Sequence, residues 1–147
     1  MASQDMQRLI DLVLQLWNTG NADIANQLYT VNAERGDPNG SDPARGPQAI
    51  SKYVAQVRTA FPDFKFEIKQ TIVDADDIAS HWTCTGTHKG DFLGIPPTGK
   101  RVEINGVALA HVQEGKIVRE HVYFDRLDML QQLGVAPAAQ TAARAGS

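Results

Sequence analysis

The chain has 147 residues, 42% of them hydrophobic and 21% charged, and carries a formal net charge of −3. These values are typical of one globular domain and exclude a disordered or fibrous chain. The acidic balance disfavours phosphate-rich surfaces, so we expect no nucleic-acid or membrane partner. No apolar run reaches the roughly 18 residues that span a bilayer, and the one cysteine, Cys84, permits no internal disulfide. We therefore expect a cytoplasmic protein.

The first half of the chain is predicted to be helical. Apolar residues from Met6 to Trp17 recur with the spacing of one buried helix face, and a short second helix is expected over 22–29. The segment 32–47, rich in Gly, Pro and Asp, is predicted as a long loop. Pro47 suits the first turn of a third helix, whose apolar face runs from Ile50 to Phe61.

From Phe64 onward, apolar and polar residues alternate with the period of 2 that is typical of strands. Strands are predicted from residue 64 to a turn at 74–77, then over 78–88, 101–112 and 116–125, and a last helical segment over 126–133. This order predicts α+β architecture, with helices on one face of a curved antiparallel sheet and a ligand cavity on its concave side. We expect a single domain over 1–135 and a flexible tail over 136–147.

The segment Gly86-Thr-His-Lys-Gly-Asp-Phe-Leu-Gly-Ile-Pro-Pro-Thr-Gly-Lys100 resembles the signature of the SnoaL-like polyketide cyclases and ester cyclases of the nuclear transport factor 2-like superfamily. Gly115-Lys-Ile117, Tyr123-Phe-Asp125 and Gln132-Leu-Gly134 follow it at the distances that this family shows. The resemblance implies a cone-shaped domain, a homodimer, and ring closure by an intramolecular aldol reaction that needs no metal or cofactor. The loop 89–100, stiffened by Pro96-Pro97, is predicted as a lid segment that holds Phe92, Leu93 and Ile95 over the cavity mouth; alternatively these residues plug the end of the core.

The resemblance also implies where site residues fall. The family's pocket aspartate falls on Val122 and its histidine on Ala108, so neither position can move a proton in this chain. Trp17 and Tyr53 fall on positions that line the substrate pocket, and Asp125 matches a common family aspartate. Asp37 is loosely similar to a polar pocket position.

The register of the last hairpin predicts which residues face the cavity. One face is formed by Val118, Glu120, Val122 and Phe124, and it lies opposite Gly106, Ala108 and Ala110. Three small residues in a row predict unfilled space, unless Trp17 or Tyr53 fills it. A carboxylate isolated among apolar residues would have a raised pKa and suit acid–base catalysis, so Glu120 is the first catalytic candidate. Pairing with Arg119 or Arg58, or a slip of one residue, is the alternative.

Further candidates lie on the second strand and the lid segment. Trp82 and Phe92 can wall the cavity, and His88 can relay protons at the end of its strand, although such a histidine also commonly caps the backbone. Asp125 is a catalytic candidate too, and its alternative is to cap the following helix. We expect a cofactor-free acid–base enzyme for a small hydrophobic carbonyl compound, or else a binding or dimerisation domain. Dimers would pair through the outer sheet face, which offers Val107, Leu109, His121 and Tyr123.

Overall fold

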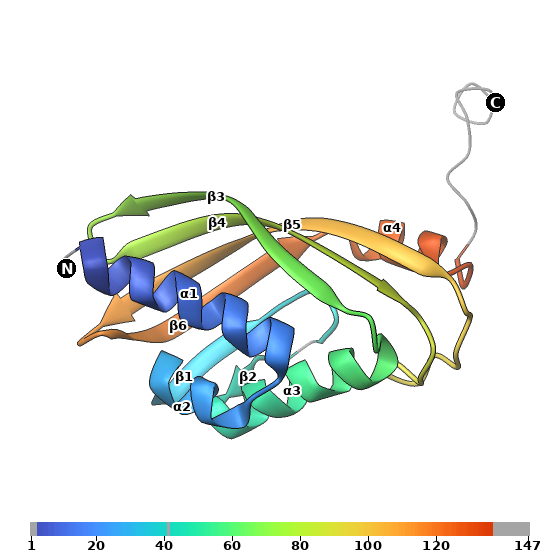
Figure 1. Cartoon of the computed structure of the whole chain (residues 1–147), viewed down its shortest axis with the longest axis horizontal. Coiled ribbons are helices and arrows are strands. Elements are labelled where there is room, and N and C mark those ends of the chain that lie inside the picture. Colours follow the sequence, from blue (N-terminus) through green and yellow to red (C-terminus); the bar gives the residue numbers. More distant parts are fainter. Residues whose placement is uncertain (1–2, 41, 137–147) are drawn as a thin grey trace.

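The computed structural model describes residues 3–40 and 42–136, in which it places four helices and six strands (Figure 1). All but the first residue of the predicted tail 136–147 lie outside the described residues. In chain order the elements are α1 (Ser3–Thr19), α2 (Ala22–Leu28), β1 (Tyr29–Gly36), β2 (Ala44–Arg45), α3 (Gly46–Ala60), β3 (Lys65–Asp74), β4 (Asp77–Thr87), β5 (Arg101–Gln113), β6 (Lys116–Phe124) and α4 (Arg126–Gln132).

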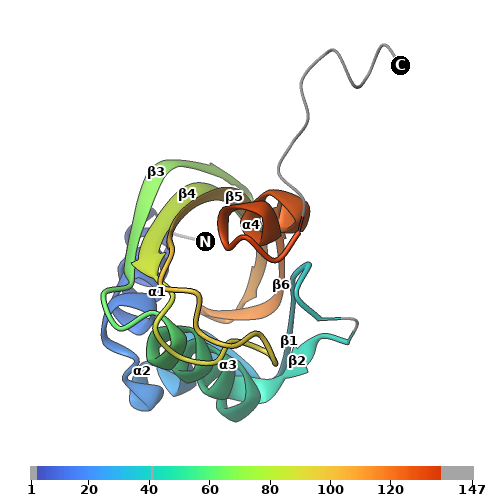
Figure 2. The same cartoon turned by 90° about the vertical axis from the view of Figure 1, so that its right-hand side faces the viewer.

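The six strands form one sheet in the order β2-β1-β6-β5-β4-β3. Figure 2 shows this sheet curving strongly, with α1, α2 and α3 on its open side and α4 beside β5 and β6. The edge strands β2 and β3 do not pair with each other, so the sheet stays open. The α+β fold class with helices closing a curved sheet is thereby confirmed. No helix in the described residues is both long and apolar enough to span a bilayer.

The predicted apolar faces of the first and third helices are buried. Met6, Leu9 and Leu16 on α1 are each at most 2% exposed, and Ile50 and Val54 on α3 are fully buried. The Asn21 side chain accepts a 3.0 Å hydrogen bond from the Asp23 N–H and so caps α2. That helix ends at Leu28 rather than at residue 29, because Tyr29 already belongs to a strand.

The predicted long loop over 32–47 is confirmed only at residues 37–40 and 42–43, and it is wrong on either side of them. Residues Tyr29–Gly36 form β1, which runs parallel to β6, and Ala44–Arg45 form β2. The sheet is therefore mixed rather than purely antiparallel. Polar residues such as Asn32 and Glu34 suggested a loop, but β1 has β6 as a partner, and Tyr29, Ala33 and Arg35 are buried there.

The four strands from β3 to β6 follow the predicted meander and register. Ala108 pairs with Val122 and Ala110 with Glu120, as the hairpin pattern predicts. A shift in register between His111 and Val112 ends this correspondence. Beyond that bulge Ile117 is buried, at 1% exposure, while Val118 is half-buried, so the inward position of Val118 was wrong.

The outer face of the sheet is partly apolar. Val107, Leu109 and Tyr123 are 40%, 49% and 57% exposed on β5 and β6, and the ring of His121 stacks on that of Tyr123. These residues lie where the sequence places a dimer interface, and the pairing of two copies stays a prediction.

Candidate active site

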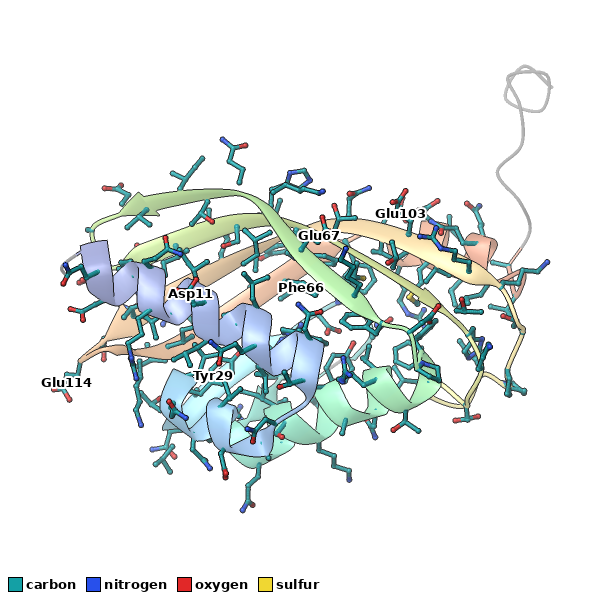
Figure 3. The ribbon with its side chains drawn as sticks, in the orientation of Figure 1. Asp11, Tyr29, Phe66, Glu67, Glu103 and Glu114 are labelled. Atoms are coloured by element: carbon teal, nitrogen blue, oxygen red, sulfur yellow. The ribbon has the colours of Figure 1, made fainter. Side chains whose placement is uncertain are left out.

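A cavity of about 100 Å³ lies between the concave face of the sheet and the helices. For comparison, one water molecule needs about 10–15 Å³ of such a cavity. Its wall includes eight aromatic residues: Trp17, Tyr53, Phe61, Phe64, Phe66, Trp82, Phe92 and Phe124. Every residue that the sequence assigned to substrate binding lines this cavity, namely Trp17, Tyr53, Trp82, Phe92, Ala108, Val122 and Phe124, and so does Glu120. Figure 3 shows Phe66 directed into the fold, whereas Glu103 lies on the outer side of the sheet.

The small residues of β5 do not all leave empty space. Ala108 lines the cavity, but the volume beside Gly106 is taken by the indole of Trp82 from the neighbouring strand. A Cβ atom on Gly106 would lie 2.7 Å from Trp82 Cε2 and 2.6 Å from the Tyr123 carbonyl oxygen. Gly106 therefore gives room to a tryptophan rather than to a ligand, and the bulky residue comes from a strand rather than from a helix.

Glu120 is buried, at 5% exposure, and it has partners. The Tyr29 hydroxyl donates a 2.7 Å hydrogen bond to Glu120 Oε1, and Arg35 Nε lies 3.4 Å from the same oxygen. Arg35 and Glu120 face each other directly in the parallel pairing of β1 and β6. The predicted isolation of Glu120 is therefore wrong, and its cation is neither Arg119 nor Arg58. Arg58 instead donates to the Trp17 carbonyl oxygen.

Arg35 is the centre of the polar end of the cavity. Its guanidinium carbon lies 5.2 Å from the ring centres of both Trp17 and Tyr53, close enough for two cation–π contacts. Its Nη1 donates a 2.7 Å hydrogen bond to Asp37 Oδ2. Burial opposes the charged form, but the nearby carboxylates of Glu120 and Asp37 outweigh it and raise the Arg35 pKa above its usual value. The guanidinium is thus a fixed cation.

Tyr53 and Asn39 complete this polar end. Asn39 Nδ2 donates a 3.0 Å hydrogen bond to the Tyr53 hydroxyl, and the Asn39 backbone N–H donates to Asp37 Oδ1 at 2.8 Å. Burial, followed by the negative charge of Asp37, raises the pKa of Tyr53, so the phenol stays protonated at neutral pH. Burial also raises the pKa of the Cys84 thiol in the cavity wall to about 12, which makes this thiol a poor nucleophile.

The structure places the other two catalytic candidates, His88 and Asp125, away from the cavity lining. The His88 Nδ1 accepts a 3.2 Å hydrogen bond from the Thr98 backbone N–H, and the Gly99 N–H donates to the His88 carbonyl oxygen. The imidazole is fully buried and stacks on Phe61, so His88 fastens the segment 89–100. Asp125 is exposed and caps α4 by accepting a 2.9 Å hydrogen bond from the Asp128 N–H.

Sequence reasoning missed Tyr29, Arg35 and Asn39, because all three lie in or beside the segment that was interpreted as a loop. The odd-numbered spacing of Tyr29, Ala33 and Arg35 is a weak strand signal, and Tyr-Thr-Val at 29–31 has high β propensity. In the described part of the chain, no three His, Cys, Asp or Glu side chains lie close enough together to hold a metal ion.

Comparison with known proteins gives a consistent result. Residues 7–133 match the family of SnoaL-like polyketide cyclases. The aklanonic acid methyl ester cyclase DnrD of Streptomyces peucetius is 26% identical over 135 residues, which cover 88% of this chain and 92% of DnrD.

Solved structures share the fold over nearly the whole chain. TsrD from Streptomyces laurentii superposes with a TM-score of 0.82 at 19% identity, over 92% of this chain and 98% of TsrD. IdmH from Streptomyces antibioticus superposes with a TM-score of 0.74 at 26% identity, over 88% of this chain and 98% of IdmH.

Proposed function

Since the chain belongs to the SnoaL-like polyketide cyclase family, we propose that it is an acid–base enzyme that closes a ring in a small hydrophobic carbonyl compound. The observation that carries this proposal is Glu120, a buried carboxylate that is anchored by its neighbours and lines an aromatic cavity. The cyclase DnrD, which matches over most of the chain, supports the same reaction class. Val122 and Ala108 stand where the family's catalytic pair is expected, so the proton transfer falls to another residue.

Glu120 has an oxygen to spare for a substrate. Within the described residues, the Tyr29 hydroxyl and the Arg35 guanidinium both approach this carboxylate at Oε1. Oε2 is therefore left for a molecule in the cavity. A hydroxyl donor and a guanidinium on Oε1 also restrict the rotation of the carboxylate, which is the kind of preorganisation that acid–base catalysis needs.

Asp37 is the competing carboxylate, and it is less suited to the role. Its Oδ1 accepts the Asn39 backbone N–H and its Oδ2 accepts Arg35 Nη1. Proton transfer to Asp37 would weaken at least one of these hydrogen bonds. We assign it the role of positioning Arg35.

In the proposed reaction Glu120 Oε2 removes a proton from a carbon next to a carbonyl group. The resulting enolate carbon attacks a second carbonyl carbon of the same molecule, which forms the ring C–C bond and breaks the carbonyl π bond. The alkoxide then takes the proton back from Glu120, so the carboxylate is regenerated and no other reactant is consumed. Trp17, Tyr53, Trp82, Phe92 and Phe124 would hold the chain of the substrate in a folded shape while water is excluded.

The first proton transfer can be tested without the natural substrate. In D₂O, exchange of the α-protons of 2-tetralone, a hydrophobic ketone, is followed by ¹H NMR with and without the protein. We expect the wild-type protein to accelerate exchange and Glu120→Gln to lose about a hundredfold or more of that acceleration. Glu103→Gln is the matched control, because Glu103 is an exposed glutamate outside the cavity lining. Equal acceleration by the wild type and Glu120→Gln would remove Glu120 from the mechanism.

A further inference from the structure

The polar end of the cavity has more negative than positive charge. Among the residues that the structure describes, three charged side chains line the cavity, Arg35, Asp37 and Glu120, at 7%, 6% and 6% exposure. With both carboxyl groups ionised, one negative charge is not balanced. Charges buried to this extent are only weakly screened by salt, so the surplus acts on any ligand that enters.

The same end of the cavity also has an unpaired hydrogen-bond acceptor. Asn39 Oδ1 is buried and, like the donor Arg35 Nε, has no hydrogen-bond partner in the described part of the chain. Asn39 Nδ2 is the atom that donates to the Tyr53 hydroxyl oxygen, at 3.0 Å, which leaves Oδ1 unpaired. An unpaired buried acceptor favours a ligand that brings an O–H or N–H donor.

The one cation that lines the cavity in the described part of the chain already faces two carboxylates. Arg35 Nη1 donates to Asp37 Oδ2, and Nε lies 3.4 Å from Glu120 Oε1 without forming a hydrogen bond. Its guanidinium also contacts the rings of Trp17 and Tyr53. It is therefore poorly placed to bind a ligand carboxylate. A ligand cation would have to approach this guanidinium, which disfavours organic ammonium compounds.

We propose that Asp37 is a specificity-determining residue: its charge makes the cavity select neutral ligands whose polar end donates a hydroxyl proton, and exclude the corresponding carboxylates. This inference rests on the proposed function in so far as the same cavity takes the substrate. It narrows the substrate class to neutral hydroxylated carbonyl compounds.

The test compares single-ring probes that share the 4-ethylphenyl group and differ in their polar end. The dissociation constants of 4-ethylphenol, 4-ethylanisole, 4-ethylbenzoate and 4-ethylbenzylamine are measured by NMR from the indole N–H signals of Trp17 and Trp82. Both tryptophans of the chain line the cavity, so each one reports on it. We expect 4-ethylphenol to bind about tenfold or more tightly than the other three probes.

Asp37→Asn removes the surplus charge and keeps the shape of the side chain. We expect it to strengthen 4-ethylbenzoate binding by about tenfold and to change 4-ethylphenol binding by less than about threefold. Asp42→Asn is the matched control, because Asp42 is an exposed aspartate near the same strand and outside the cavity lining. It is expected to leave all four constants unchanged.

Several outcomes would overturn the inference. If the wild-type protein binds 4-ethylbenzoate as tightly as 4-ethylphenol, the inference is overturned. This result needs no variant, so it holds even if Asp37→Asn does not fold. Unchanged 4-ethylbenzoate binding in folded Asp37→Asn would remove the role of Asp37, and preference for 4-ethylbenzylamine would point to an organic cation. In these cases the proposed function stands. Failure of all four probes to bind at millimolar concentration would contradict the ligand cavity, and the proposed function with it.

Discussion

The Tyr29 hydroxyl lies 2.7 Å from Glu120 Oε1 and donates a hydrogen bond to it, which joins the first residue of β1 to the last long strand of the sheet. Both side chains are buried, and Arg35, six residues further along β1, contacts the same oxygen. The candidate catalytic carboxylate is thus held by a strand that pairs with its own strand in parallel. The position of Glu120 therefore depends on contacts with residues far away in the sequence, 91 positions in the case of Tyr29.

Replacing Tyr29 by Phe removes this hydrogen bond and leaves the aromatic packing in place. We expect the free energy of unfolding in urea to fall by about 2 kcal/mol, because a buried hydrogen bond to a charged group is lost. Tyr123→Phe is the control, since Tyr123 is 57% exposed on the outer face of the sheet, and it should change stability by less than about 0.5 kcal/mol. Equal losses in the two variants would show that the Tyr29–Glu120 contact contributes nothing measurable.

The buried phenols predict sensitivity to alkaline pH. Burial, followed by the charge of Glu120, raises the pKa of Tyr29 well above its usual value, and burial and Asp37 raise that of Tyr53. Below a pH of about 10 both the folded and unfolded chains keep these protons. Above it only the unfolded chain releases them, so the stability supplied by the protonated phenols is lost as pH rises.

We therefore expect the urea midpoint of the wild type to fall steadily from about pH 10 upward. The double variant Tyr29→Phe, Tyr53→Phe has no such protons to lose, so its midpoint should change less over the same range, whatever its stability at pH 7. Parallel pH profiles for the two proteins would contradict the raised pKa values.

The packing of the Trp82 indole depends on the absence of a side chain at Gly106. Because a Cβ atom at position 106 would lie within 2.7 Å of both the indole and the Tyr123 carbonyl oxygen, we expect Gly106→Ala to cost about 1–3 kcal/mol of unfolding free energy. In the background of Trp82→Phe, whose smaller ring lacks the clashing indole atoms, the same substitution should cost less. A double-mutant cycle in urea measures the difference, and additive effects would show that the indole does not exclude the methyl group.

The hairpin of β5 and β6 was predictable because its pattern is local. Strict alternation and the short turn at Glu114-Gly115 fix which side chains face inward, so Ala108, Glu120 and Val122 were placed correctly. A bulge has no comparable signal in the sequence. Because of the bulge after His111, Ile117 lies in the interior where Val118 was predicted.

The polar end of the site was not predictable in the same way. Arg35 is buried only because β6 places Glu120 opposite it and because two aromatic rings cover its guanidinium. These contacts are far apart in the sequence, and an arginine followed by Gly-Asp-Pro is typical of an exposed loop. The resemblance to a family located the cavity, but the charges in it came from the packing of β1.

The most direct measurement for the central claim is a crystal structure of the protein with 2-tetralone bound. The account predicts the ketone inside the aromatic cavity, with an α-carbon about 3–3.5 Å from an oxygen of Glu120 and with Tyr29 still donating to Oε1. A ketone bound elsewhere, or bound in the cavity with both α-carbons beyond the reach of Glu120, would contradict the assignment of this residue as the base.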